Sequence, residues 1–173
     1  MPTEFISDKA IYERVIQEMV IEAERFVWIA TADIKDMYVK RGNRMAPFLG
    51  VLADLIESGI EVRLLHAKEP GPNFRKDFDR FPALITGLER MLCPRVHFKS
   101  VIVDGRRAYT GSANLTGAGM GAKSEARRNF EAGILTDDKT LVRDIMNQFD
   151  QLWIGGFCEA CERKQYCPDC PLE

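Results

Sequence analysis

Short apolar runs alternate with amphipathic segments along this chain, and this alternation restricts its fold more than any other feature. The runs Phe26–Ala32 and Ile60–His66 are rich in aromatic and branched aliphatic residues, as buried strands are. The segments before them, Ile11–Phe26 and Pro47–Gly59, repeat apolar residues at steps of three and four, the period of an amphipathic helix, and Ser7 can cap the first. Strands that alternate with helices predict an α/β fold.

The second half of the chain adds a hairpin to this pattern. Strands are predicted at Arg95–Val103 and Arg107–Thr110, joined at Asp104-Gly105, a dipeptide typical of tight turns. A further strand at Phe130–Thr136 and a last helix over residues 141–152 follow. Because one hairpin interrupts the alternation, the expected fold is α/β with a mixed β-sheet covered by helices.

Three other segments lack a clear period and are predicted to be irregular. The segment Asp33–Asn43 is polar and contains a glycine, which favours a loop. The segment Lys68–Asn73 contains two prolines and a glycine. Residues Phe74–Met91 have a mixed pattern, interrupted by a proline and a glycine, and are interpreted as loop and broken helix.

Length and composition indicate one main domain. A chain of 173 residues, 46% of them hydrophobic, can bury one core, so residues 1–155 are expected to form that domain and residues 156–173 an appended tail. The 24 basic and 26 acidic residues give a net charge of -2, so any recognition of phosphate depends on a local cluster of cations. The N-terminus resembles no signal peptide and no run is long enough to span a membrane, so a cytoplasmic protein is expected.

The predicted hairpin gathers polar side chains at one end of the sheet. Residues two apart on a strand share a face, so His97 and Lys99 are expected side by side, and the second strand returns Ser112 and Asn114 towards them. A neutral imidazole can attack phosphorus, while an ammonium group, a hydroxyl and an amide stabilise the charge on the phosphate oxygens without a metal. The alternative to a catalytic site is a buried strand whose histidine has its hydrogen-bond partners within the protein and whose lysine extends to solvent.

The full pattern is His97, Lys99, then four residues to Asp104, then six residues to Gly111-Ser112-x-Asn114. It resembles the signature of the phospholipase D superfamily, and a match at this many positions is far more specific than a lone His-x-Lys pair. The family fold, an α/β sandwich around a mixed sheet, agrees with the order of strands and helices derived above.

The resemblance implies a role for each residue of the motif. It makes His97 the nucleophile, Lys99 and Asn114 ligands of the phosphate, and Ser112 a supporting hydrogen-bonding group. It makes Glu131 the carboxylate that holds the second ring nitrogen of the nucleophile. It also implies that Asp104 and Gly111 are structural, with Asp104 bracing the hairpin rather than contacting substrate.

The family reaction has two steps and uses two histidines, one as nucleophile and one as general acid and base. This chain has one copy of the full motif, and its other histidine, His66, ends a predicted strand without a Gly-Ser-x-Asn segment after it. An ordinary structural role for His66 is therefore favoured. A twofold homodimer in which His97 faces its copy supplies the second imidazole, so a shared active site is expected.

A second group of cations lies close to the motif in sequence. A glycine-rich segment, residues 117–121, precedes three of them and a turn carries two more, which gives Lys123, Arg127, Arg128, Arg106 and Arg107. Such a cluster can hold a polyanionic substrate, although a solvated loop is an equally good interpretation. The cluster favours DNA or RNA as substrate.

Four cysteines crowd into the tail as two Cys-x-x-Cys pairs five residues apart: Cys158, Cys161, Cys167 and Cys170. Four thiolates can close a tetrahedral zinc site, and in so short a segment the metal would supply folding energy. Structural zinc is predicted, with an iron–sulfur cluster as the alternative because the spacer is short for a zinc ribbon. Cys93 is interpreted as a buried apolar residue rather than a ligand.

Three functions remain open at this point. A nuclease is favoured by the single motif and the neighbouring cations. A phospholipase or phosphatidyl transferase would call for an exposed apolar rim or amphipathic helix, which the sequence does not show. A binding module that keeps the fold without the chemistry is disfavoured, because the complete set of motif residues is present.

Overall fold

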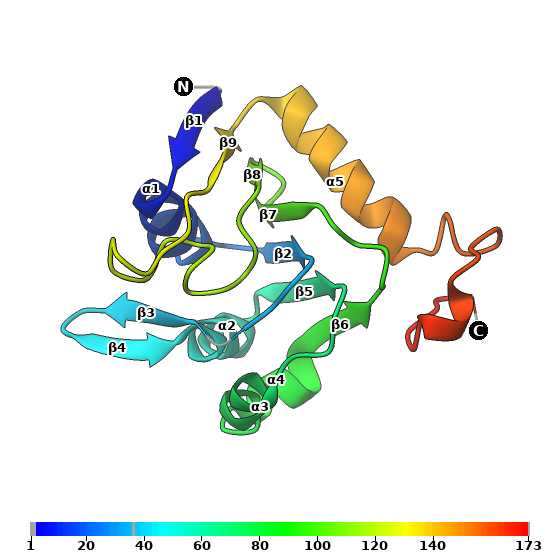
Figure 1. Cartoon of the computed structure of the whole chain (residues 1–173), viewed down its shortest axis with the longest axis horizontal. Coiled ribbons are helices and arrows are strands. Elements are labelled where there is room, and N and C mark those ends of the chain that lie inside the picture. Colours follow the sequence, from blue (N-terminus) through cyan, green and yellow to red (C-terminus); the bar gives the residue numbers. More distant parts are fainter. Residues whose placement is uncertain (1–2, 36, 173) are drawn as a thin grey trace.

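The computed structural model describes residues 3–35 and 37–172, and the sheet at its centre has seven strands within these residues (Figure 1). In spatial order the strands are β1 (Thr3–Ser7), β9 (Ala132–Thr136), β8 (Arg107–Gly111), β7 (Lys99–Val103), β2 (Phe26–Thr31), β5 (Glu61–His66) and β6 (Leu88–Leu92). Strands β2, β5 and β6 run parallel, whereas β7, β8, β9 and β1 pair antiparallel. The predicted mixed sheet is confirmed.

Helices cover both faces of this sheet (Figure 1). They are α1 (Lys9–Ile11), which continues as the π-helical η1 (Tyr12–Val20), α2 (Phe48–Glu57), α3 (Pro72–Phe78), α4 (Pro82–Gly87) and α5 (Lys139–Trp153). The larger core lies between the sheet and the helices η1 and α2. The smaller core lies under α5, where Phe149 stacks on Trp28 with ring centroids 5.2 Å apart. None of the helices within the described ranges is long and apolar enough to cross a membrane.

Four strands of the structure differ from the prediction. Strand β1 and strand β6 were not predicted, and the segment expected to be a loop forms a second hairpin, β3 (Tyr38–Arg41) paired with β4 (Arg44–Pro47). Gly42 lies in its turn at a φ of +59°, a conformation that favours glycine. These strands are short and partly polar, so their sequences lack a strong two-residue alternation.

The strand that follows the signature histidine begins later than predicted. Strand β7 starts at Lys99 rather than Arg95, because Pro94 lies in a turn that the N–H of Val96 closes on the carbonyl oxygen of Cys93 at 3.0 Å. The strand β9 starts at Ala132 rather than Phe130. Ser7 belongs to β1 and does not cap the first helix, whose N-cap position is Asp8.

The register of the sheet brings the ends of five strands to one edge. Thr31 at the end of β2 pairs with His66 at the end of β5, which in turn pairs with Leu92 at the end of β6. On the other side of β2, the start of β7 pairs with the end of β8 through Lys99 and Gly111. The signature residues therefore lie at the same edge as the loop that connects β6 to β7.

Candidate active site

Lys99 is the buried member of the signature, and His97 is exposed beside it. Lys99 begins β7 with 8% of its surface exposed, and its Nζ donates a hydrogen bond to the carbonyl oxygen of His97 at 2.6 Å. Thr110 on β8 donates to the carbonyl oxygen of Lys99 at 3.1 Å. The expectation that both side chains stand on one strand is wrong, because His97 lies in the connecting loop before β7.

Ser112 and Glu131 form a hydrogen-bonded pair at the end of β8. The hydroxyl of Ser112 donates to Oε2 of Glu131 and accepts from the N–H of Ala132 at 3.1 Å. Nδ2 of Asn129 donates to the other oxygen of Glu131 at 3.0 Å. The carboxylate is thus engaged by a hydroxyl and an amide in this structure, and its predicted contact with the ring of His97 stays a prediction.

The orientation of Asn114 is set by two donors. Its Oδ1 accepts from the N–H of Asp33 at 3.1 Å and from the hydroxyl of Thr31 at 3.4 Å. Since the oxygen is occupied, the Nδ2 group is the part of the side chain that can donate to a substrate. The role of Asn114 as a ligand of phosphate oxygens stays a prediction.

Two residues that sequence reasoning missed hold these groups in place. Thr31 is buried, and its hydroxyl donates to the carbonyl oxygen of Asp33 at 2.7 Å, lies 3.4 Å from Oδ1 of Asn114 and accepts from the N–H of Leu115 at 2.9 Å. Asp8 accepts the N–H of Glu131 at 2.9 Å through Oδ1 and donates its own N–H to the carbonyl oxygen of Glu131 at 2.9 Å. Thr31 could have been found as a polar residue inside a predicted apolar strand, whereas no pattern pointed to Asp8.

Gly111 is required by the packing of two strands. A Cβ atom at this position would lie 2.5 Å from the carbonyl oxygen of Ala132 and 2.7 Å from the Cα of Gly133 on the neighbouring strand. Both atoms belong to the backbone of the sheet, so they cannot move aside cheaply. The structural role expected for Gly111 therefore has a direct cause in the β8–β9 contact.

Asp104 braces the opposite end of the hairpin. Its carboxylate accepts the backbone N–H groups of Glu24, Arg25 and Phe26 at 3.0, 2.7 and 3.0 Å, and the residue itself has a φ of +58°. Burial raises the pKa of Asp104, but these N–H donors and the nearby Arg106 outweigh it, so the pKa lies below its ordinary value of 3.8. Asp104 thus ties the β7–β8 turn to the start of β2.

Replacement of Asp104 by alanine is expected to destabilise the fold by about 3 kcal/mol, because three backbone donors lose their acceptor. Since the folded-state pKa is lowered, the stabilisation is fully present above the ordinary pKa and is lost as the pH falls through the lower one. Urea unfolding at neutral and acidic pH measures both effects. Asp144→Ala, which removes an exposed carboxylate paired with Arg143, is the control and should change little. Equal stability of the two variants would contradict the bracing role.

Arg106 and Arg107 lie far from the site, contrary to the prediction that they bind substrate. They follow the turn at the other end of the hairpin, about 13 Å along β7 from Lys99 at the usual rise per residue. Arg106 pairs with Glu24 and Arg107 with Glu22, both at 3.0 Å. Their charges are partly neutralised by these ion pairs.

The other three predicted cations lie in the connection between Asn114 and Glu131. Lys123 and Arg127 are exposed and Arg128 is half-buried, and none of the three forms an ion pair within residues 3–35 and 37–172. The loop is closed by the N–H of Asn129, which donates to the carbonyl oxygen of Ala118 at 3.0 Å. These cations therefore stand on the same loop as the site.

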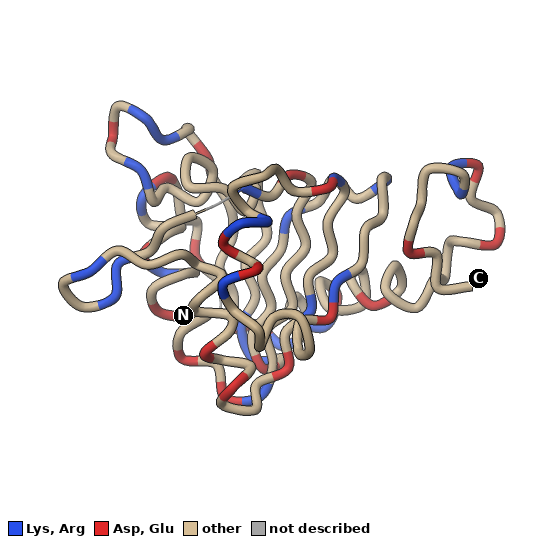
Figure 2. The backbone as a smooth tube through the Cα atoms, turned by 90° about the horizontal axis from the view of Figure 1, so that it is seen from below, with Lys and Arg blue, Asp and Glu red and all other residues tan. Residues whose placement is uncertain are grey.

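A groove of about 800 Å³ runs beside this loop. Its walls come from the β3–β4 hairpin, from the segment before α3, and from the glycine-rich loop through Gly117 and Lys123. It reaches Asp33, whose N–H is bound to Asn114. Figure 2 shows that two loops carrying Lys and Arg project from the same side of the molecule. The groove thus adjoins the site through Asp33, and its charged lining residues are Asp33, Glu69, Lys35 and Lys123.

His66 occupies a structural position, as expected. It is 1% exposed, and its Nδ1 lies 2.7 Å from the carbonyl oxygen of Lys68. Burial lowers the pKa of His66 below its ordinary value of 6.5. Two strand spacings separate it from β7, which is about 10 Å across the sheet.

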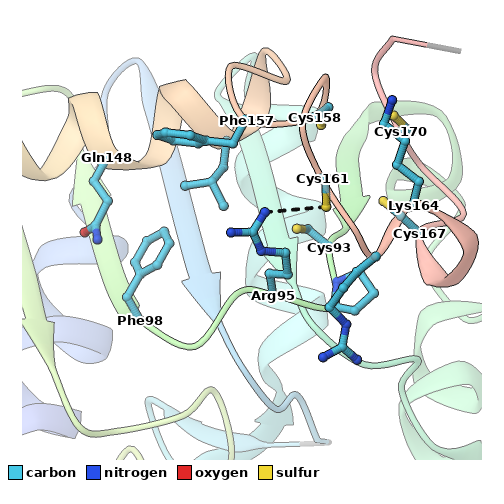
Figure 3. A pocket seen from close by; sticks show the side chains of 13 residues that line it. Cys93, Arg95, Phe98, Gln148, Phe157, Cys158, Cys161, Lys164, Cys167 and Cys170 are labelled. Atoms are coloured by element: carbon cyan, nitrogen blue, oxygen red, sulfur yellow. Dashed lines mark hydrogen bonds between the residues drawn. The ribbon is translucent and has the colours of Figure 1, made fainter.

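The tail cysteines gather at one pocket beside α5 (Figure 3). Cys158, Cys161, Cys167 and Cys170 are free thiols that line it together with Cys93. Within the described residues, no three His, Cys, Asp or Glu side chains form a ready-made metal site. The zinc predicted at these four cysteines therefore stays a prediction.

Comparison with known proteins places this chain in a family. The model of a family described as "Cardiolipin synthase, PLD-like domain" matches residues 16–153, which include the whole stretch from His97 to Glu131. The chain belongs to the phospholipase D superfamily. The resemblance inferred from the signature is thereby confirmed.

A curated relative and three solved structures are similar to this superfamily member. The mitochondrial cardiolipin hydrolase of Chlamydomonas reinhardtii is 30% identical over 104 residues, which are 60% of this chain and 44% of that protein. The chain thus spans less than half the length of that relative.

The structure of Nuc, a phospholipase D family member from Salmonella typhimurium, has a TM-score of 0.61 at 15% identity, covering 87% of this chain and 93% of that one. NucT from Helicobacter pylori has a TM-score of 0.60 at 14% identity, covering 86% and 93%. The archaeal chromatin protein TrmBL2 has a TM-score of 0.60 at 15% identity, covering 88% and 52%. At these identities the likeness shows the shared fold alone.

Proposed function

We propose that this chain is a phosphodiesterase that forms a phosphohistidine at His97, and that its substrate is DNA or RNA. The observation that carries the proposal is the exposed His97, whose carbonyl oxygen binds Lys99, with Gly111 of the same signature paired with Lys99 across the hairpin. Membership of the phospholipase D superfamily supports the chemistry.

In the first step a ring nitrogen of His97 attacks phosphorus, a P–N bond forms, and the bond from phosphorus to the leaving oxygen breaks. A second imidazole donates a proton to that oxygen. In the second step this imidazole takes a proton from water, whose oxygen displaces His97 from phosphorus. Lys99 would turn from the carbonyl oxygen of His97 to the phosphate oxygens, and the Nδ2 group of Asn114 would donate to them as negative charge develops.

The second imidazole is proposed to come from another copy of this chain. His66 is buried and hydrogen-bonded to its own loop, which supports a source outside the chain. His97 is exposed at an open edge, so a twofold partner can approach it. We therefore propose a homodimer with one active site at its axis.

The cations beside the site favour nucleic acid over phospholipid as substrate. A nucleic acid extends beyond the scissile phosphate and presents further phosphates along its length. The groove beside Lys123, which leads to Asp33 next to Asn114, can follow such a chain. A substrate with a single phosphate would contact the signature residues and would not need the groove or its cations.

The double variant Lys123→Ala/Arg127→Ala is expected to weaken binding of a labelled oligonucleotide and to lower the slope of log affinity against log salt by about 2. The matched control, Arg106→Ala/Arg107→Ala, removes the same charge at the far end of the hairpin and should leave the slope unchanged. Equal losses in both variants would mean that the cations act only through net charge.

A phospholipid substrate is the second candidate. The matching family model and the curated relative both carry cardiolipin in their names. In addition, Phe130 is 96% exposed directly before Glu131, where an apolar side chain could contact acyl chains. Parallel assays with single-stranded DNA, duplex DNA, RNA and phospholipid vesicles, all in chelator, decide between the two. Cleavage of phospholipid alone would overturn the proposed nuclease activity.

The tail is proposed to bind a structural metal through its cysteines. Cys158, Cys161, Cys167 and Cys170 line one pocket, and four thiolates suit zinc. An iron–sulfur cluster has the same ligand type and is the alternative. Metal analysis of the purified protein is expected to give about one zinc per chain, whereas iron with acid-labile sulfide would identify the cluster.

A further inference from the structure

The tail is fastened to the end of strand β6 by Cys167 and Asp169. The N–H of Leu92 donates to Oδ2 of Asp169 at 2.7 Å, and the Sγ of Cys167 lies 3.6 Å from the carbonyl oxygen of Leu92 in a hydrogen bond. Both polar backbone groups of Leu92 are therefore satisfied by the stretch from Cys167 to Cys170. This contact fixes where the tail meets the sheet.

The next residue after Leu92 is Cys93, so the docked tail surrounds a fifth thiol. Cys93 lines the same pocket as the four tail cysteines, and the pocket has a volume of about 280 Å³ (Figure 3). Its backbone is anchored as well, because the N–H of Cys93 donates to the carbonyl oxygen of His66 at 2.9 Å. One thiol from the rigid sheet edge thus faces four from the tail.

A cation also enters this cluster from the loop that carries Cys93. Nη1 of Arg95 donates to the Sγ of Cys161 at 3.5 Å, and Arg163 and Lys164 line the same pocket. Four thiolates around a divalent metal leave a net charge of -2 on the centre. Cations in the wall of the pocket offset that charge, so the surroundings suit a thiolate-rich metal centre.

We propose that Cys93 is a ligand of the metal centre of the tail, so that the metal joins the tail to the loop between β6 and β7. The inference rests on the proposed metal binding by the tail and adds a ligand to it. The metal is a thiolate-preferring one, zinc or an iron–sulfur cluster. With five thiols and four coordination positions, Cys93 occupies one position and one tail cysteine remains outside the centre.

This arrangement links the metal to the active site through a short stretch of chain. Cys93 lies four residues before His97 in the same loop, and Phe98 on the far side of His97 also lines the cysteine pocket. A metal held by Cys93 therefore fixes both the tail and the beginning of the segment that carries the nucleophile. The sequence did not predict that Cys93 and the tail cysteines share a pocket, since 64 residues separate Cys93 from Cys158 in the chain.

The test uses the full chain purified without oxygen and loaded with cobalt(II) in place of zinc. Thiolate-to-cobalt charge-transfer absorption reports how many thiolates bind the metal, and competition with a chelator gives the affinity. Cys93→Ser leaves four thiols, so the tail cysteine outside the centre can take the vacant position, and the expected result is binding weakened by tenfold or more rather than a lower charge-transfer intensity. Asp169→Asn, which weakens the docking contact and keeps all five thiols, should retain the full intensity.

Each outcome bears on one of the two proposals. Unchanged affinity in Cys93→Ser, with the fold intact by circular dichroism, would leave the tail site standing and remove Cys93 from it. A wild-type chain that takes up neither cobalt nor zinc nor an iron–sulfur cluster would remove both. If the wild type carries an iron–sulfur cluster, loss of iron and sulfide in Cys93→Ser, but not in Asp169→Asn, supports Cys93 as a ligand.

Discussion

Replacement of His97 by alanine is expected to abolish phosphodiester cleavage and to leave the fold intact. The ring is the proposed nucleophile, and loss of a nucleophile costs on the order of 10⁴-fold or more in turnover. The side chain is exposed and precedes β7, so its removal opens no cavity in either core. Cleavage of a labelled oligonucleotide in chelator measures the activity, and thermal unfolding measures the stability.

His66→Gln serves as the matched control, since it removes the other histidine of the chain. His66 is buried at the end of β5, so this variant should lose stability while each folded molecule keeps its activity. Trapping with labelled substrate and rapid denaturation should give a labelled protein for the wild type and none for His97→Ala. Wild-type cleavage by His97→Ala would reject the mechanism.

The signature was readable from the sequence because its geometry is local. Lys99 and Gly111 face each other across one hairpin, and Asp104 lies at its turn, so a spacing of four and six residues encodes their positions. The strong apolar runs of β2, β5 and β7 were equally readable, because burial on both faces imposes apolar residues on most positions.

Contacts between distant segments could not be read in the same way. The link between Asp8 and Glu131 spans 123 residues, and that between Thr31 and Asn114 spans 83. Each depends on which strands become neighbours, which a periodic pattern does not specify. The same limit explains why Arg106 was expected at the site. Arg106 is close to the signature in sequence, but the length of a strand separates it from Lys99, and it forms an ion pair with Glu24.

The number of histidines in the chain predicts how activity changes when wild-type and His97→Ala chains are mixed. The two-step reaction needs an imidazole on each side of phosphorus, and a single ring cannot occupy both positions. His66 is buried and bonded to the carbonyl oxygen of Lys68, so we propose that the second ring is His97 of a partner chain. The protein is accordingly expected to sediment as a dimer at micromolar concentration.

Mixing wild-type chains with His97→Ala chains should therefore reduce activity more steeply than dilution does. After full subunit exchange, a mixed dimer holds one imidazole and is inactive, so activity follows the square of the wild-type fraction. An equal mixture should keep about a quarter of the activity instead of half, as random pairing in a twofold dimer requires. Chains with different affinity tags establish that exchange is complete. A linear loss under that condition would show that each chain completes the reaction alone, and that the general acid is a group other than a second His97.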